Sequence, residues 1–157
     1  MIRSKFFIFL IIIACCACND TTKTPNTLLD YTHNSTQRLT GVWERTGYYN
    51  YDENGKISDS FTAMAGNRHI KIFTQDKVMW CRNISLDSTE WFGYGHYTIT
   101  DSLLVEELEY GSVKISKRIT RNPKFTSQYT ITENKFSQIQ IDEQGHALFA
   151  ENYIRLE

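Results

Sequence analysis

Residues 91–100, WFGYGHYTIT, alternate between two sets of side chains. One set consists of Trp91, Gly93, Gly95, Tyr97 and Ile99, and the other of Phe92, Tyr94, His96 and Thr98. Successive side chains of a β-strand point to opposite faces of the sheet, so each set occupies one face. The segment therefore predicts a strand with large side chains on both faces. Its two glycines share a face, which allows a bend of the strand or the close approach of a neighbouring element.

Short runs of the same character fill the chain from Gly41 onward. They are rich in Val, Ile, Thr and aromatic residues, and turn-forming residues such as Asn54-Gly55 separate them. The ten candidate strands are residues 42–49, 58–64, 69–74, 77–84, 90–100, 102–110, 113–120, 125–132, 135–142 and 146–156. No stretch with a helical period is long enough to compete with this pattern. The short connections between these strands predict an antiparallel meander.

A meander of this length predicts a closed sheet. An open sheet leaves two unpaired edges, and closure into a barrel removes both. We therefore predict an all-β fold, an antiparallel up-and-down β-barrel of about 8 to 10 strands. A barrel of this size can hold a small ligand in its interior. The candidates for the wall of such a pocket are Trp80, Trp91, Tyr97, Glu106, Arg118 and Tyr129.

Two segments at the ends of this region carry a family resemblance. LTGVWERTGYY, residues 39–49, contains Gly41-Val42-Trp43, and AENYIRLE, residues 150–157, contains Arg155. A Gly-x-Trp at the first strand with an arginine in the last resembles the lipocalin and calycin pattern, and more closely the small lipocalin-like lipoproteins of Bacteroidota. The resemblance covers residues 39–157 and implies a lipocalin-like barrel. It also implies that Trp43 closes one end of the barrel with Arg155 across its ring, a structural role.

The first 20 residues predict where the protein resides. Arg3 and Lys5 precede an uncharged apolar run, and small residues stand before two cysteines, the order found in secretory signals. A small residue followed by Cys resembles the lipobox of bacterial lipoproteins, whose thiol receives a diacylglyceryl group. Cys18 gives a signal of ordinary length and is followed closely by an acidic residue, whereas Cys15 matches the preceding pattern better. Cys18 is therefore the predicted lipidation site, with Cys15 as the alternative.

These features divide the chain into three parts. Residues 1–17 are the predicted lipoprotein signal peptide, residues 18–38 a flexible tether rich in Thr, Asn and Ser, and residues 39–157 the barrel domain. The apolar run is too short for a permanent membrane-spanning helix. We expect a lipid-anchored protein of the bacterial cell envelope, at the outer membrane, with acyl chains such as palmitate as its anchor. Which face of the membrane it occupies is left open.

The sequence contains no arrangement of residues that predicts a metal, a cofactor or nucleic-acid binding. Its four histidines are scattered, without the spacing of a metal site. Residues 18–157 carry 15 basic and 18 acidic residues, which excludes a basic footprint for nucleic acid. Removal of the signal leaves Cys81 as the one cysteine besides the lipidated one, so the domain has no disulfide, and we expect Cys81 to be buried.

Three hypotheses of function follow. The first is a lipid-anchored binding module for a small, partly apolar ligand, which requires an internal cavity. The second is a non-enzymatic envelope protein that acts through its outer surface as a subunit, adaptor or inhibitor, and it requires an exposed apolar patch. The third, an enzyme, would need convergent polar groups in a cleft. The sequence favours the first two, and we expect no enzymatic activity.

Overall fold

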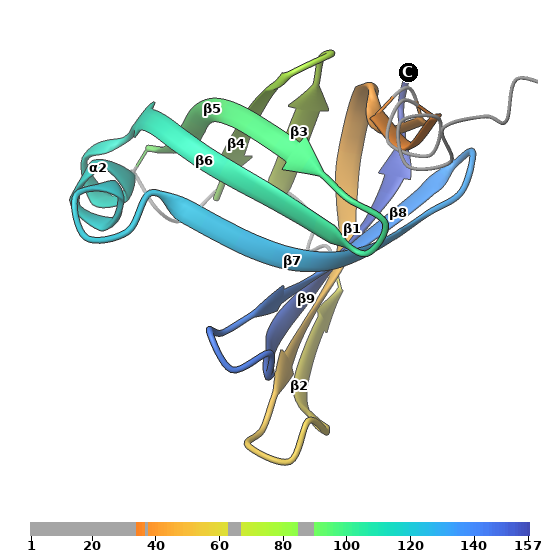
Figure 1. Cartoon of the computed structure of the whole chain (residues 1–157), viewed down its shortest axis with the longest axis vertical. Coiled ribbons are helices and arrows are strands. Elements are labelled where there is room, and N and C mark those ends of the chain that lie inside the picture. The colour runs from red at the N-terminus through yellow and green to blue at the C-terminus, as the bar shows by residue number, and fades with distance from the viewer. Residues whose placement is uncertain (1–33, 37, 63–66, 85–89) are drawn as a thin grey trace, which may run out of the picture.

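A computed structural model describes residues 34–36, 38–62, 67–84 and 90–157. The predicted signal, both candidate lipidation sites and residues 18–33 of the predicted tether lie outside these ranges. The elements are β1 (Gly41–Tyr51), β2 (Ile57–Thr62), β3 (Arg68–Phe73), β4 (Lys77–Asn83), β5 (Trp91–Ile99), β6 (Leu103–Gly111), α2 (Val113–Ile119), β7 (Lys124–Ile131), β8 (Lys135–Ile141) and β9 (Ala147–Arg155), as Figure 1 shows. In the described part of the chain, no helix is long and apolar enough to span a membrane.

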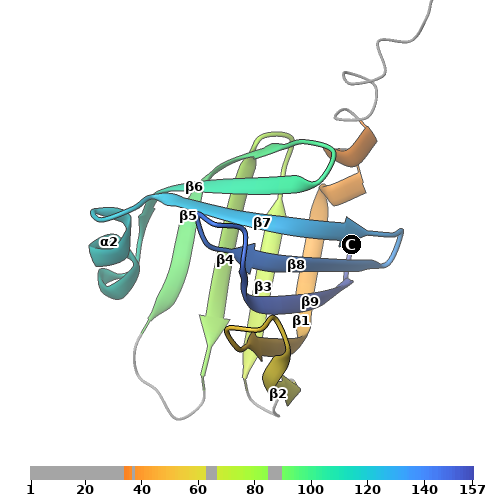
Figure 2. The ribbon, with the colours of Figure 1, turned by 60° about the horizontal axis from the view of Figure 1, so that its bottom comes forward.

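The strands form one antiparallel sheet that closes on itself. From β3 to β9 each strand pairs with the next, and β1 pairs with both β3 and β9. These eight strands make a closed barrel, in which β7, β8 and β9 lie across β3, β4 and β5 (Figure 2). The predicted antiparallel β-barrel is confirmed.

The ninth strand, β2, extends the sheet along the second half of β1. Residues Gly47 to Tyr51 of β1 pair with β2, whereas Gly41 to Glu44 pair with β3. The partner of Gly47 is Thr62 and the partner of Glu44 is Ile70. Between these two pairs β1 advances by three residues, whereas the facing chain advances by eight, from Thr62 to Ile70. β2 and β3 thus pair with successive parts of β1 on the side of that strand opposite β9.

The prediction of a strand at residues 113–120 is wrong, because this segment forms the helix α2. Its sequence, VKISKRI, alternates like a strand but also places Ile115 and Ile119 four residues apart, on one face of a helix. Ile115 is buried against the barrel, while Val113 is almost fully exposed. Seven residues are too few for the two periods to be told apart from sequence. The helix lies in the connection between β6 and β7, at one end of these strands (Figure 1), and contacts β5 and β6.

The two glycines of β5 permit close approaches at both positions. A Cβ atom on Gly95 would lie 2.1 Å from the backbone oxygen of Glu107, at a point where the pairing of β5 with β6 shifts register. A Cβ atom on Gly93 would lie 2.9 Å from the Trp80 ring. Gly95 therefore lets the neighbouring backbone come near, and Gly93 makes room for an inward-facing tryptophan.

Cys81 does not lie in the core as expected. It is exposed on the outer face of β4, because Val78, Trp80 and Arg82 take the inward positions of that strand. The alternation of β4 explains the error, since a cysteine between two inward side chains must point outward.

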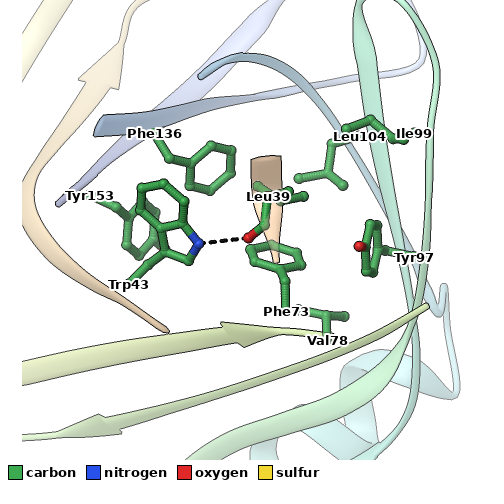
Figure 3. Close-up of a cluster of buried hydrophobic side chains, with 9 residues drawn as sticks. All are labelled: Leu39, Trp43, Phe73, Val78, Tyr97, Ile99, Leu104, Phe136 and Tyr153. Carbon is green, nitrogen blue, oxygen red and sulfur yellow. Dashed lines mark hydrogen bonds between the residues drawn. The ribbon is translucent and has the colours of Figure 1, made fainter. Parts of the chain in front are cut away.

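One end of the barrel is filled by an apolar core (Figure 3). Its buried members are Leu39, Trp43, Phe73, Val78, Tyr97, Ile99, Leu104, Phe136 and Tyr153. The Trp43 indole N–H donates a hydrogen bond of 2.8 Å to the backbone oxygen of Leu39. Leu39 itself is fully buried at the end of a helical segment, residues 34–36 and 38–39. Leu39, the first residue of the predicted barrel domain, thus closes this end of the barrel.

Arg155 covers the core from outside. The carbon of its guanidinium lies 4.1 Å from the centre of the Trp43 ring. The same group donates hydrogen bonds to the backbone oxygens of Glu133 at 2.7 Å, of Thr40 at 2.8 Å, and of Arg38. It therefore joins the chain segment before β1, the turn between β7 and β8, and the last strand.

Candidate functional site

The other half of the barrel encloses a cavity of about 470 Å³. Its wall contains both polar and apolar side chains. The polar residues are Arg45, His69, Lys71, Arg82, Glu106, Ser127, Gln138, Gln140 and Glu151, and the apolar residues are Tyr48, Phe61, Trp80, Trp91, Leu108, Ile115, Phe125 and Phe149. A site of this size with mixed walls is typical of small-molecule pockets.

The strands pass from core to cavity in steps of two residues. Along β3, the buried inward side chains are Phe73 in the core, then Lys71, then His69. Along β9, Tyr153 belongs to the core and Glu151 lines the cavity. Because inward positions recur every second residue, these strands set a layer of polar groups directly above the core. We call the layer formed by Arg45, Lys71, Glu106, Gln138 and Glu151 the polar floor.

The polar floor is a connected network of hydrogen bonds. Lys71 Nζ donates to Glu106 Oε1 at 2.7 Å and to Gln138 Oε1 at 3.0 Å. The side-chain nitrogen of Gln138 donates to Glu151 Oε2 at 3.1 Å, and Arg45 donates to Glu151 Oε1 at 2.7 Å. Both carboxylates thus have a cationic partner at short range, which offsets the cost of removing them from water.

Burial and charge fix the ionisation of this region. Burial alone would raise the pKa of Glu151, but the positive charges of protonated His69, of Lys71 and of Arg45 lower that pKa to about 2. Burial lowers the pKa of His69 to about 3, against the opposing effect of Glu151. Burial also raises the pKa of Tyr153, whose hydroxyl donates to Glu151 at 2.8 Å. At neutral pH Glu151 is therefore ionised and His69 is neutral.

His69 faces the cavity without a hydrogen-bond partner. Its side chain is 9% exposed, and neither ring nitrogen makes a hydrogen bond with another described residue. Its Nδ1 atom lies 3.6 Å from Glu151 Oε1, beyond hydrogen-bond distance. A neutral imidazole carries one donor and one acceptor, and both are buried here without compensation.

Aromatic side chains form the upper part of the wall. Tyr48 stacks on Phe149 with ring centres 5.3 Å apart. Near α2, the Lys114 ammonium lies 4.9 Å from the centre of the Trp91 ring. The Arg118 guanidinium lies 4.8 Å from the centre of the Phe125 ring. The helix thus presents positive charge beside two aromatic side chains of the cavity.

The structure brings three of the six predicted wall residues together. Trp80, Trp91 and Glu106 line the cavity. The other three lie elsewhere in the fold.

Tyr97, Tyr129 and Arg118 are corrections to the predicted wall. Tyr97 points inward but belongs to the filled end of the barrel, where its hydroxyl donates to the backbone oxygen of Thr74 at 2.8 Å. Tyr129 packs against the same core and donates to the backbone oxygen of Thr100 at 3.0 Å. Arg118 lies on α2, outside the cavity, because its segment is a helix and not the predicted strand.

Most residues of the polar floor, and His69, were not among the predicted wall residues. The signal that could have found them is a polar residue in phase with a core aromatic on the same strand. His69 and Lys71 alternate with Phe73, Glu151 alternates with Tyr153, and this pattern marks a polar side chain on the inner face. If the sheet were open, the same polar residues would be expected to face solvent.

Within the described residues, no three His, Cys, Asp or Glu side chains are grouped to hold a metal ion. His96 and His146 lie outside the cavity, 3.4 Å from Glu109 and 3.0 Å from Asp142, respectively. His33 lies outside the described ranges.

Comparison with known proteins identifies the fold but no close relative. No family model and no curated protein matches the chain. A solved lipocalin-like protein from Bacteroides uniformis matches with a TM-score of 0.50 at 15% identity, over 75% of this chain and 97% of that one. A redesigned β-barrel matches with a TM-score of 0.43 at 15% identity over 78% and 95% of the two chains. Lobster apocrustacyanin A1 matches with a TM-score of 0.45 at 13% identity over 84% and 68%. The closed eight-stranded barrel and its similarity to the Bacteroides protein show that this chain has a lipocalin-like fold.

Proposed function

We propose that the domain binds a small, partly apolar ligand inside its barrel. The observation that carries this proposal is the cavity of about 470 Å³, large enough for a small organic molecule. Its aromatic wall would bury the apolar part of the ligand, and the polar groups would orient it. We propose a non-enzymatic role, which is supported by the pairing of Glu106 and Glu151, the carboxylates among the described lining residues, in ion pairs of 2.7 Å.

We also propose that a lipid anchor attaches this module to the bacterial envelope, at the outer membrane. The order of charged, apolar and small residues before Cys18 supports the proposal. Residues 19–33 then leave a polar connection between the lipid and the first described residue of the domain. Multiple acyl chains on one cysteine would hold the protein at the membrane stably.

Replacing the cysteines one at a time tests the anchor. We expect that Cys18→Ser releases the protein from the membrane fraction, because the acylated thiol is lost. Cys15→Ser is the matched control and should leave the protein at the membrane. Intact-mass measurement of the mature N-terminus would check the result, and acylation that persists in Cys18→Ser but is lost in Cys15→Ser would assign the anchor to Cys15.

Native mass spectrometry tests the binding function. The chain is purified from its own host's envelope and examined for a discrete added mass that disappears on denaturation. Ser127→Phe places a phenyl group in the cavity, because Ser127 is buried in its wall. Gln128→Phe is the matched control, since the neighbouring side chain points outward. The proposal predicts an added mass in the natural chain and in Gln128→Phe, and its loss in Ser127→Phe.

A bare mass in every case would contradict the binding function, provided that lipid and metabolite extracts of the host were added beforehand. An added mass that survives Ser127→Phe would place the ligand outside the cavity. Either result would send the search to the outer surface.

A row of apolar side chains on that outer surface supports the second candidate, a protein-interaction role. Ile72, Met79 and Tyr110 are exposed, and Tyr94 joins them into a row across β3, β4, β5 and β6. In this row Ile72 pairs with Met79, Met79 with Tyr94, and Tyr94 with Tyr110. If the row docks a protein, Met79→Lys should abolish cross-linking of that protein to the domain in whole cells and leave the ligand mass unchanged.

A further inference from the structure

The helix α2 turns a basic face toward solvent. Lys114, Lys117 and Arg118 stand at the spacing i, i+3 and i+4, which places them on one side of the helix, and Arg121 follows just after its end. All four residues are exposed. Ile115 points to the barrel from another side of the helix and is buried. We call these four cations the basic face.

The charge of the basic face is not balanced by nearby carboxylates. Among the described residues, none of its four members forms an ion pair. The carboxylates on the outer side of β6 contact other cations, Glu109 with Lys77 at 2.9 Å and Glu107 with Lys124 at 3.4 Å. Two members of the basic face lie over aromatic rings, which attract a cation without neutralising it.

The stability of the helix does not explain this surface. Cations are favourable in the last turn of a helix, where Lys117 and Arg118 stand. Lys114 stands in the first turn, which holds no acidic residue, and a cation there opposes the helix dipole. Its neighbour Val113 is apolar and yet 74% exposed. A partner that is both anionic and partly apolar accounts for both residues.

The basic face is a local feature of an acidic chain. Residues 111–132 contain five basic residues and no acidic one, whereas the rest of residues 18–157 contains 10 basic and 18 acidic residues. A cluster of Lys and Arg beside an exposed apolar side chain is typical of surfaces that touch anionic lipid headgroups. The lipid phosphates attract the cations, and the apolar side chain enters the boundary with the acyl chains.

The predicted anchor allows α2 to reach a membrane. The described chain begins at residue 34, beside the filled end of the barrel, and α2 lies on the opposite side (Figure 2). The nine residues of β6 run from the core residue Leu104 toward α2, a distance of about 30 Å. Residues 19–33 can span up to about 50 Å. A barrel anchored at Cys18 can therefore lay α2 on the same membrane.

We propose that the basic face and Val113 bind the phosphate-bearing headgroups of anionic lipids in the membrane that holds the anchor. The choice of a membrane as partner rests on the proposed lipid anchor, whereas the charge and exposure of α2 do not. An anchor alone leaves the barrel free to turn. Contact through α2 holds the barrel in one orientation on the membrane.

Vesicle sedimentation tests the proposal without the anchor. The chain from residue 19 keeps every described residue and lacks both candidate lipidation sites. It is mixed with vesicles of phosphatidylcholine alone, or of phosphatidylcholine with phosphatidylglycerol, and the bound protein is measured. The proposal predicts binding to the anionic vesicles, no binding to the neutral ones, and weaker binding as the salt concentration rises.

Paired lysine variants locate the contact. Lys114→Gln combined with Lys117→Gln should weaken binding to the anionic vesicles by about 25-fold, since each basic side chain near such a surface contributes about fivefold. Lys56→Gln combined with Lys135→Gln is the matched control, because it removes the same charge from exposed positions outside α2. The control should bind nearly as well as the natural chain.

Val113→Asp separates membrane contact from helix stability. A carboxylate in the first turn favours the helix, but anionic lipid repels it. The variant should therefore weaken vesicle binding without lowering the midpoint of urea unfolding.

Two results would overturn the proposal. One is equal binding to the two kinds of vesicle, or an equal loss in the two lysine combinations. The other is binding to heparin without binding to vesicles, which would mean that the basic face recognises a free polyanion. Neither result bears on the anchor, because the release of Cys18→Ser from the membrane fraction tests it separately.

Discussion

At the scale of single residues, Arg155 has the widest set of contacts at the closed end. It reaches four backbone oxygens and one aromatic ring with one planar group. A lysine keeps the charge but has no fork of donors that could reach several acceptors at once. Arg155 therefore stabilises the closed end through geometry as well as charge.

Arg155→Lys should lower the free energy of unfolding by about 1.5 to 3 kcal/mol, the usual range for hydrogen bonds to a charged group. Urea unfolding followed by tryptophan fluorescence measures this difference. Lys135→Arg, at an exposed position that begins β8, is the control and should have little effect. An equal effect of the two substitutions would show that Arg155 acts through charge alone.

The buried histidine predicts how stability depends on pH. Below about pH 6.5 a histidine in the unfolded chain takes up a proton, whereas folded His69 stays neutral until about pH 3. The free energy of unfolding should therefore decrease as the pH is lowered from about 6.5 to about 3, by up to about 1.4 kcal/mol per pH unit. Glu151 adds a second loss between its ordinary pKa of 4.5 and its value of about 2 in the fold.

Urea unfolding at about pH 7 and about pH 5 measures the contribution of His69, since both values lie above the range in which Glu151 titrates. His69→Gln should remove most of the difference in unfolding free energy between the two pH values. His146→Gln is the control, because its side chain is 71% exposed. A wild-type chain whose stability is unchanged between these pH values would contradict the burial of a neutral His69.

The polar floor shows where prediction from sequence stops. Alternation separated the two faces of β5 without showing which one points inward, and the wall candidates Trp80 and Trp91 do line the cavity. Lys71 and Glu151 share their face with core aromatics, yet a charged residue in a strand usually faces water. Only the closure of the sheet, which brings Lys71 to Glu106 and Arg45 to Glu151, shows that these charges are internal and paired.

At the scale of elements, α2 is a helix in a segment for which the sequence predicted a strand. A strand would place Val113 and Ile115 on one face, whereas a helix separates them. The structure buries Ile115 and exposes Val113. The strands themselves could be predicted because each is bounded by turn residues and paired with a neighbour, while α2 depends on its contact with β5 and β6.

Two single substitutions distinguish a helix from a strand in this segment. Ile115→Ala should destabilise the domain by about 2 to 4 kcal/mol, because it removes a buried side chain. Val113→Ala should change stability by less than about 0.5 kcal/mol. Thermal or urea unfolding of both variants measures the difference, and similar losses in the two would favour a strand.

At the scale of the whole molecule, closure makes β9 more important than β2 for the stability of the barrel. β9 pairs with both β8 and β1, whereas β2 pairs with β1 alone. A proline removes a backbone donor from the ladder. Substitution in the closing strand should therefore affect the entire barrel, and substitution in β2 should affect one edge.

Asn152→Pro in β9 should abolish the cooperative unfolding transition, because Asn152 lies between Gly47 of β1 and Ser137 of β8. Ser60→Pro in β2 is the control and should keep that transition with a lower midpoint. Circular dichroism during urea titration measures both. A cooperative transition in Asn152→Pro would mean that the sheet is stable without closure.

The pairing of β1 with β9 also governs when the protein can fold. Trp43 and Arg155 are direct partners in this ladder, although they stand near opposite ends of the domain. The ribosome makes β1 first and β9 last, so β1 can pair with β2 and β3 early but lacks β9 until translation of the domain is complete. Folds that depend on such distant contacts fold slowly, in milliseconds to seconds. Until β9 is made, the unpaired side of β1 is open to chaperones, proteases and other unfinished chains.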